Sequence, residues 1–438
     1  MNNSKSFFIK SFGCQMNIYD SDKMRDIFIS HGMSQANHYE HADYVVLNTC
    51  HIREKATEKT YSDLGRVNKK GKINNKIIVT GCVAQAEGDL IRKRVPFVDL
   101  VLGPQSLQTL DKYLSNEIIE DKTITEFDAI EKFDSLKKFP SYNSSSSAFL
   151  TIQEGCDKFC TFCVVPYTRG SEYSRRIDDI LFEAKNMANS GAVEITLLGQ
   201  NVNAYHGEDK NGTQRDLTYL INKISEIEKI KRITYSTSHP NNMTDKLIEL
   251  HGSNEKLLPF LHLPVQSGSN KILKLMNRKH TREFYFGIID KIKKQKKDIA
   301  LSSDFIIGFP GEEEKDFDDT IDLIEQVEFM NSYSFIYSPR PGTPAADRKQ
   351  VSLKIQEERL KIAQSLLNEQ QKNFNKKFLK KTLEVLISSS GKYEGQVKGR
   401  SEFNQSVAIE GNSKYIGNIV PVNITDVSSH SLIGKTKS

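Results

Sequence analysis

Three cysteines lie close together near the middle of the chain, at Cys156, Cys160 and Cys163. A structural zinc site would need four ligands, and no histidine lies between His51 and His206 to supply a local fourth. A 4Fe–4S cluster held by three cysteines instead leaves one iron open, and that iron can chelate the amino and carboxylate groups of a methionine-derived substrate. A disulfide with one spare thiol is the alternative, which a reducing cytosol disfavours.

The other three cysteines, Cys14, Cys50 and Cys82, are dispersed, but each follows a predicted strand directly. The first third of the chain predicts an open parallel α/β sheet with strands at 7–12, 44–47, 76–80 and 99–102 and helices at 20–31 and 53–69. The carboxyl ends of parallel strands share one edge, where ligands usually bind, so the three thiols are expected to converge. Free cysteines are often buried core residues, but the repeated placement in loops favours a shared site.

Two further folding units follow. Strands predicted at 148–153, 194–198, 232–236, 257–261, 301–307 and 332–337 alternate with helices and indicate a partial (βα)6 barrel with its reactive face at the strand ends. Short strands at 382–388, 392–398, 405–410, 418–423 and 431–435 indicate a small OB-like β-barrel. The predicted domains are 5–119, 142–374 and 377–438, with a polar linker at 120–141.

The charge of the chain is concentrated at one end. All 438 residues sum to a net charge of +5, yet residues 376–438 contain ten Lys or Arg and five Asp or Glu, so the rest of the chain is balanced. This excess, with aromatic residues Phe378, Tyr393, Phe403 and Tyr415, is typical of an RNA-binding surface, although the aromatics could equally fill the barrel core. No apolar run reaches the ~18 residues of a membrane span, and no signal peptide is visible, so the expected location is the cytoplasm.

Eight motifs resemble the radical S-adenosylmethionine (SAM) methylthiotransferase family, beginning with the cysteine spacing and the aromatic Phe162 before its last cysteine. The others are Gly-Cys-Gln-Met-Asn at 13–17, Asn-Thr-Cys at 48–50, Gly-Cys-Val-Ala-Gln at 81–85, Val-Val-Pro-Tyr-Thr-Arg-Gly at 164–170, Leu-Gly-Gln-Asn-Val-Asn-Ala-Tyr at 198–205, and His-Leu-Pro-Val-Gln-Ser-Gly at 262–268, with Tyr-Ser-Pro-Arg at 337–340. The C-terminal barrel resembles a TRAM domain. His51 departs from the family pattern, which has a small residue there.

The resemblance implies the site residues. Cys156, Cys160 and Cys163 would hold a catalytic 4Fe–4S cluster that binds and reductively cleaves SAM. A second 4Fe–4S cluster, where sulfur is presented, would be held by Cys14, Cys50 and Cys82. Residues expected to contact the cofactor are Phe162, Gln200, Asn201, Gly308 and Gly311, the two glycines lying in a segment that resembles the superfamily's adenine-contacting turn.

The resemblance also implies a reaction. Members most similar to this chain methylthiolate C2 of N6-(dimethylallyl)adenosine at position 37 of the tRNA anticodon loop, with one SAM cleaved to a radical and one giving a methyl group. That carbon is neither acidic nor nucleophilic, so a cofactor must activate it. The implied partners are tRNA, a reduced flavodoxin- or ferredoxin-type electron donor and a sulfur donor that the sequence does not identify, with a monomer as the expected state.

Two rival functions remain open from the sequence. One is a methylthiotransferase acting on threonylcarbamoyl-adenosine in tRNA or on a ribosomal protein. The other is a non-catalytic iron–sulfur RNA-binding regulator, which would leave Gly308, Gly311 and the motifs at the strand ends unexplained.

Overall fold

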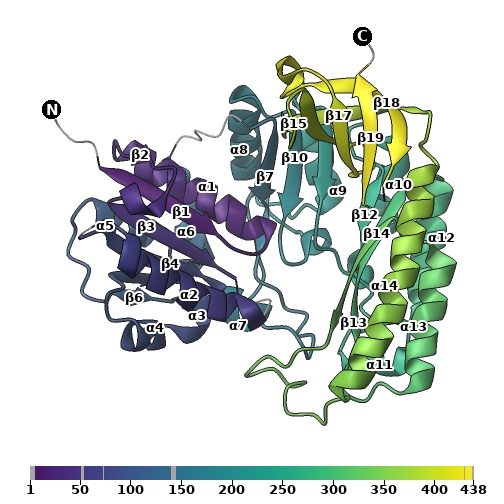
Figure 1. Ribbon diagram of the computed structural model, residues 1–438, viewed down its shortest axis with the longest axis horizontal. Helices are drawn as coiled ribbons and strands as arrows, with labels where there is room; N and C mark the ends of the chain where they lie inside the picture. The colour runs from purple at the N-terminus through teal and green to yellow at the C-terminus, as the bar shows by residue number, and fades with distance from the viewer. Residues whose placement is uncertain (1–4, 51–53, 73, 140–144, 429, 437–438) are drawn as a thin grey trace.

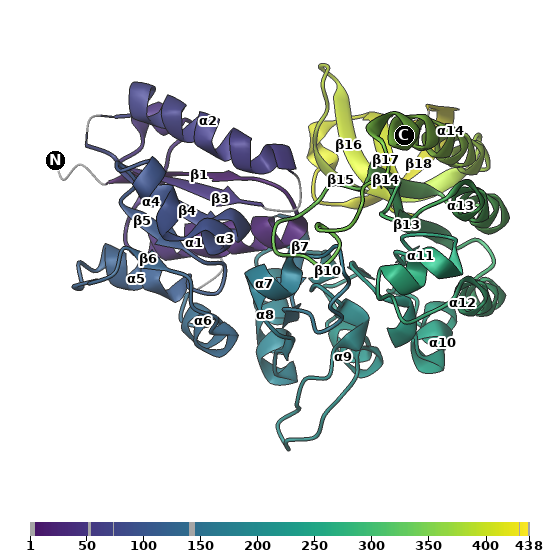
Figure 2. The same ribbon diagram turned by 90° about the horizontal axis from the view of Figure 1, so that it is seen from below.

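The computed structural model describes residues 5–50, 54–72, 74–139, 145–428 and 430–436. The N-terminal α/β domain, purple to blue in Figure 1, lies beside a central barrel in teal and green, against which the yellow C-terminal barrel packs. Seen from below in Figure 2, the N-terminal domain lies to the left of the central barrel and the yellow C-terminal barrel lies above it. Among the described residues, no helix combines the length and apolarity that crossing a bilayer requires.

The N-terminal domain is built on the predicted parallel sheet, in the order β2-β1-β3-β4-β5-β6. Its strands are β1 (Ser6–Ser11), β2 (Ser34–Gln35), β3 (Tyr44–Thr49), β4 (Lys76–Gly81), β5 (Leu100–Leu102) and β6 (Thr123–Ile124). Its helices are α1 (Gln15–Ser30), α2 (Glu54–Lys70), α3 (Cys82–Glu87), α4 (Asp89–Arg94) and α5 (Gln108–Leu114). Apolar runs in β3 and β4 are buried on both faces, as expected where helices cover both sides of a parallel sheet.

The stretch predicted as a linker, 120–141, contains regular secondary structure. It contains β6 at the edge of the sheet and helix α6 (Ala129–Leu136). Phe133 and Lys132 on this helix are buried, at 2% and 0% exposure. The polar composition of this stretch did not indicate an amphipathic helix, because one of the buried residues of the helix, Lys132, is charged.

Part of the N-terminal domain packs into the hydrophobic core of the central domain. Met16 and Tyr19 of α1 and Phe133 of α6 pack in the same cluster as Leu150 and Ile152, at the start of the central barrel. Such a continuous apolar contact fixes the two domains against each other.

The central domain is an open barrel of six parallel strands. Two three-stranded sheets, β7-β10-β11 and β12-β13-β14, are joined by a bridge between Ile233 and Leu257. The strands are β7 (Ser147–Thr151), β10 (Glu194–Leu198), β11 (Arg232–Tyr235), β12 (Phe260–His262), β13 (Ala300–Ile307) and β14 (Asn331–Ile336). The helices are α7 (Val165–Arg169), α8 (Ile177–Asn189), α9 (Leu217–Ser225), α10 (Asp245–Ser253), α11 (Asn270–Leu275), α12 (Arg282–Gln295) and α13 (Glu314–Val327), and a small hairpin pairs β8 (Gln153–Glu154) with β9 (Tyr173–Ser174).

The predicted barrel is confirmed, with one strand displaced. The fourth strand was expected at 257–261, but β12 begins at Phe260. Pro259 precedes it and has no N–H for a ladder, so Leu257 makes only the single bridge to the neighbouring strand.

The C-terminal domain is a closed five-stranded barrel in the order β15-β16-β17-β19-β18, connected to the central domain by the long helix α14 (Leu353–Lys376). Its strands are β15 (Thr382–Ser390), β16 (Gln396–Ser401), β17 (Ser406–Glu410), β18 (Ile419–Val427) and β19 (Ser431–Thr436). The strand predicted at 392–398 starts later, because a turn precedes it in which Gly391 N–H donates to the carbonyl of Gln396. Phe378 and Phe403 belong to the barrel core, whereas Tyr393 is 66% exposed.

Candidate functional site

The three dispersed cysteines lie at the carboxyl ends of three adjacent parallel strands. Cys14 follows β1 and precedes α1, Cys50 follows β3, and Cys82 follows β4 as the first residue of α3. Gly13 lies against Cys50 so closely that a Cβ on it would be 2.3 Å from the Cβ of Cys50. Cys14 and Cys82 are near enough to interact electrostatically. The departure at His51 lies outside the described residues.

Side chains next to these cysteines form hydrogen bonds between the loops at this edge of the sheet. Asn17 donates from Nδ2 to the carbonyls of Phe12 (2.8 Å) and Thr49 (2.9 Å), which precede Cys14 and Cys50 in sequence. Asn48 donates to the carbonyl of Asn17 (2.8 Å), and Thr49 Oγ1 donates to the carbonyl of Thr80 (2.6 Å). The polar residues of the Gly-Cys-Gln-Met-Asn and Asn-Thr-Cys motifs therefore fix the three loops relative to one another.

The loop of Cys156, Cys160 and Cys163 follows β8 and is held by a segment more than 100 residues further along the chain. Thr161 donates from its backbone N–H to Met276 O (3.1 Å), and Asn277 Nδ2 donates to Phe159 O (3.0 Å). Arg278 donates from Nη1 to the sulfur of Cys160 at 3.6 Å. This contact could not be predicted from sequence, because nothing in the composition of residues 276–278 marks them as neighbours of the cysteine loop.

Both cysteine sets open onto one cavity of about 580 Å³ inside the central barrel. The thiol-bearing residues that line it are Cys14, Cys82, Cys156, Cys160 and Cys163. Cys50 is buried behind Gly13, at 3% exposure. Arg400 and Asn404 of the C-terminal barrel also line the cavity, so all three domains contribute to its wall.

The predicted cofactor contacts fall into two groups. Gln200 and Asn201 line the cavity just after β10, where Gln200 Oε1 accepts from Gly155 N–H (2.6 Å) and Asn201 is 1% exposed. Phe162 also lines it and packs edge-on against Phe309, with ring centroids 6.5 Å apart.

Gly308 and Gly311 take a different place. Both lie in the turn after β13, and neither is among the described residues that line the cavity. Gly308 N–H donates to the carboxylate of Glu312 (3.0 Å), and its carbonyl accepts from Gln356 of α14 (2.9 Å). These contacts stabilise the turn, which places Phe309 against Phe162.

Burial favours the protonated form of three thiols, those of Cys14, Cys156 and Cys163. It raises the pKa of Cys156 to about 11 and that of Cys163 to about 12. Burial also raises the pKa of Cys14, although the guanidinium of Arg169 opposes this shift. A nucleophilic thiol normally has a depressed pKa, so these cysteines suit metal ligation, where the metal's own charge stabilises the thiolate.

The donor set fits a cluster and a polar cofactor. Within the described residues, no three His, Cys, Asp or Glu side chains are grouped to hold a single metal ion. A cluster bonds its thiolates to different irons, so it needs a wider arrangement of ligands than one ion does. The cavity wall also carries buried polar atoms that have no partner among the described residues, on Asn201, Thr234, Ser238 and His239. Buried polar atoms normally find partners, so this wall is suited to a polar ligand.

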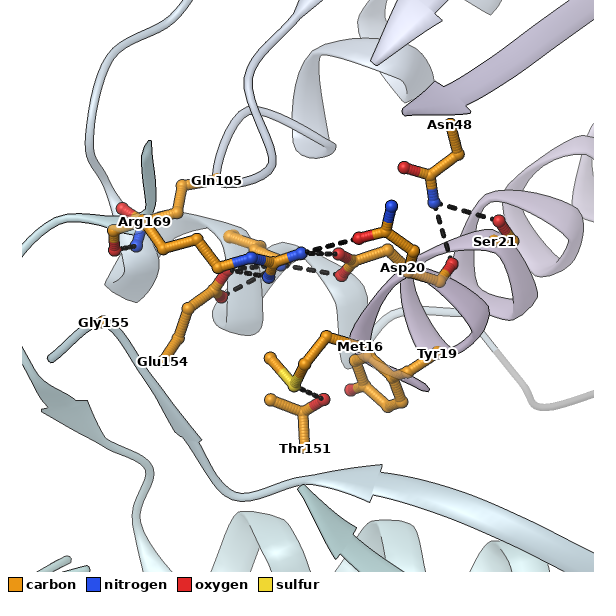
Figure 3. A network of polar contacts seen from close by, with 12 residues as sticks. Met16, Tyr19, Asp20, Ser21, Asn48, Gln105, Thr151, Glu154, Gly155 and Arg169 are labelled. Carbon is orange, nitrogen blue, oxygen red and sulfur yellow. Dashed lines mark hydrogen bonds and ion pairs between the residues drawn. The ribbon is translucent and has the colours of Figure 1, made fainter. Parts of the chain in front are cut away.

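A buried network of four charges joins the two cysteine sets. Figure 3 shows Arg169 and Glu154, from the central barrel, facing Asp20 on α1. Arg169 pairs with Glu154 (2.6 Å) and Asp20 (3.0 Å), and Lys132 of α6 pairs with the same two carboxylates (3.0 and 2.9 Å). All four side chains are at most 2% exposed. Glu154 lies two residues before Cys156, so the network ties the cysteine loop directly to the N-terminal domain.

Comparisons with known families divide the chain into the same three regions. Residues 6–103 match the uncharacterized protein family UPF0004, residues 150–324 the radical SAM superfamily, and residues 376–437 the TRAM domain. Among solved structures, the radical SAM methyltransferase TsrM from Kitasatospora setae has a similar fold, with a TM-score of 0.54 at 11% identity, covering 78% of this chain and 77% of TsrM.

Curated relatives match over their full length. A tRNA-2-methylthio-N(6)-dimethylallyladenosine synthase from Rickettsia bellii is 51% identical, covering 99% of both chains. One from Wolbachia pipientis subsp. Culex pipiens is 52% identical, covering 98% of this chain and 99% of the relative. With half of all residues shared from end to end, and with all three domains present, the chain belongs to the tRNA-2-methylthio-N(6)-dimethylallyladenosine synthase family of radical SAM proteins.

Proposed function

We propose that this protein methylthiolates C2 of N6-(dimethylallyl)adenosine at position 37 of the tRNA anticodon loop. The main support for this proposal is that five of the six cysteines line one cavity. The reaction needs a radical and a sulfur atom at the same carbon. The two cysteine sets must therefore face the same adenine base. Full-length identity of about half to synthases of this name supports the same substrate.

Cys156, Cys160 and Cys163 are assigned to the 4Fe–4S cluster that the radical SAM family implies, and Cys14, Cys50 and Cys82 to a second one. When bound, the first cluster supplies the electron that cleaves SAM, and the second presents sulfur. The chain holds these thiols rigidly, because Asn17 and Asn48 bridge the N-terminal loops and Thr161 anchors the other loop.

Side chains of the barrel wall would bind and orient SAM. Asn201 Oδ1, Ser238 Oγ and His239 Nε2 are buried without a partner in the described structure and can bond to polar groups of the cofactor. Gln200 is the neighbouring cavity residue, and Phe162 supplies an apolar surface. The predicted contacts of Gly308 and Gly311 with the cofactor stay a prediction; their turn supports Phe162 through Phe309.

The C-terminal barrel would hold the RNA beside the cavity. Arg232 donates to the carbonyls of Glu384 (2.6 Å) and Arg400 (3.1 Å), which docks this barrel on the central one. Arg400 itself reaches the cavity wall, and Tyr393 is exposed for stacking. Basic groups attract phosphates and aromatic rings stack on unpaired bases, as in other readers of single-stranded RNA.

The remaining partners follow from this chemistry. A reduced flavodoxin- or ferredoxin-type protein would supply electrons in the cytoplasm, and the enzyme would act as a monomer, because one chain already contains both cysteine sets and the RNA-binding barrel. The sulfur donor is not assigned.

Nucleoside analysis of tRNA from a strain lacking this gene tests the proposed substrate. We expect the 2-methylthio form to disappear and N6-(dimethylallyl)adenosine to accumulate in its place, with restoration by the intact gene. Unchanged 2-methylthio nucleosides would remove the tRNA hypothesis, and loss of a methylthio group from threonylcarbamoyl-adenosine or a ribosomal protein would identify one of the rival substrates.

Replacing Gly13 with alanine should remove the second cluster and leave the first. Gly13 has φ +92°, and a Cβ there would lie 2.5 Å from the sulfur of Cys50, so this ligand must move. We expect iron content to fall by about four atoms per chain, since a 4Fe–4S cluster is lost, while SAM cleavage persists.

Gly32→Ala is the matched control for this prediction. Gly32 also has a positive φ (+74°), but nothing lies within 4 Å of the added Cβ. Both variants place alanine at a positive φ, which costs about 1–2 kcal/mol, and only the first displaces Cys50. Equal iron content in the two variants would contradict the placement of Cys50 in a cluster site.

A further inference from the structure

Arg278 is a buried cation whose charge no carboxylate balances. It follows α11, is 5% exposed, and donates from Nη2 to the carbonyl of Pro264 (2.5 Å) and from Nη1 to the sulfur of Cys160 (3.6 Å). Its Nε has no partner, and it forms no ion pair with Asp or Glu in the described part of the chain. The buried cations Lys132 and Arg169, by contrast, are each paired with two carboxylates.

Among the described residues, no Asp or Glu side chain pairs with Arg278, and the other charged side chain that acts on the neighbouring His239 is also a cation, Lys158. Burial, followed by the charge of Arg278 itself, lowers the pKa of His239 to about 2 and that of His280 to about 4, so both imidazoles are neutral. The group in contact with this guanidinium that can become an anion is the sulfur of Cys160 in the cysteine loop.

A buried charge without a counter-charge is strongly unfavourable, so a site that retains one normally binds the opposite charge. Three thiolates around a 4Fe–4S core give a net negative site, and uptake of one electron from a reductant makes it more negative with no change in bonding. A cation at hydrogen-bond distance from one sulfur stabilises the reduced form more than the oxidised form, and hydrogen bonds to cluster sulfurs set potentials in this direction.

We propose that Arg278 is the counter-charge of the three-cysteine site, donating an N–H to the thiolate of Cys160 and raising the reduction potential of the cluster held there. This inference rests on the proposed function only in placing a cluster at Cys156, Cys160 and Cys163. In this role Arg278 sets how easily the cluster accepts an electron. The role also explains why a guanidinium from a segment distant in sequence lies against the cysteine loop.

The test compares Arg278→Gln, which removes the charge, with Arg278→Lys, which keeps it. The full-length, anaerobically reconstituted protein is titrated with a low-potential reductant, and the cluster is followed by the electron paramagnetic resonance signal that changes when SAM is added. At a fixed ambient potential we expect Arg278→Gln to have an about tenfold lower ratio of reduced to oxidised cluster, which is a shift of about 59 mV for a one-electron couple. Arg278→Lys should lie between this variant and the wild type.

Lys279→Gln is the matched control, because it removes an exposed charge one residue away and should leave the ratio unchanged. If Arg278→Gln binds no iron but Arg278→Lys binds it normally, the counter-charge is needed for assembly and the proposal holds. A wild-type ratio in Arg278→Gln, or equal iron loss in both Arg278 variants, would overturn it. The measurement needs no tRNA, so a wrong substrate assignment would leave its outcome unaffected, while absence of iron in the wild type would refute the proposed function instead.

Discussion

Cys156→Ala is expected to abolish the formation of 5′-deoxyadenosine from SAM, whereas Cys14→Ala should leave that cleavage intact and abolish only methylthiolation. The two thiols line the same cavity but belong to different loops, one after β8 and one after β1. Loss of either cluster therefore removes a different half of the reaction. 5′-Deoxyadenosine and modified tRNA nucleosides, measured on the same reaction mixtures, separate the two effects.

Each variant serves as the control for the other. Reconstituted wild-type protein should contain about eight irons per chain and each variant about four, because each retains one 4Fe–4S cluster. Cleavage of SAM by a folded Cys156→Ala protein would contradict the assignment of the contiguous cysteines. Methylthiolated tRNA produced by Cys14→Ala would contradict that of the dispersed ones.

Glu154→Gln is expected to lower the free energy of unfolding by about 3–5 kcal/mol. Glu154 is fully buried and balances Lys132 and Arg169, so its neutralisation leaves Asp20 as the one carboxylate for two buried cations. Glutamine preserves the size of the side chain, so the loss reports charge and not a cavity. The midpoint and slope of urea unfolding measure the change.

Glu410→Gln provides the matched substitution. Glu410 pairs with Lys435 at 2.7 Å, but the two side chains are 71% and 60% exposed, so its loss should change the free energy of unfolding by less than about 1 kcal/mol. Adding Lys132→Met to Glu154→Gln should recover part of the stability, because one cation then faces one carboxylate. Equal effects of Glu154→Gln and Glu410→Gln would show that the network does not join the domains energetically.

The architecture was predictable where local pattern determines it. Apolar runs such as β3 and β4 are buried on both faces, and the cysteines directly after them could be placed at one edge from the rules of parallel sheets. Convergence of Cys14 with Cys82 follows from topology alone, without side-chain detail. The motifs then indicated the chemistry that such an edge could support.

The contacts between distant segments were not predictable. Lysine is almost never fully buried, so Lys132 in a polar stretch gave no sign that α6 completes the charge network. Arg278 lies 118 residues from Cys160 in sequence, and only the folded barrel brings them together. Phe378 and Phe403 had two possible roles, and the closed barrel places both in its core.

The most direct test of the central claim is a reaction of the purified, reconstituted protein with tRNA that carries N6-(dimethylallyl)adenosine, SAM, sulfide as the source of sulfur, and a low-potential reductant. We predict that mass spectrometry of the digested tRNA will show the 2-methylthio nucleoside at that position with the wild-type chain and none with Cys156→Ala. Formation of 5′-deoxyadenosine with the adenosine left unmodified would contradict the account, because both cysteine sets would then be present without acting on this base.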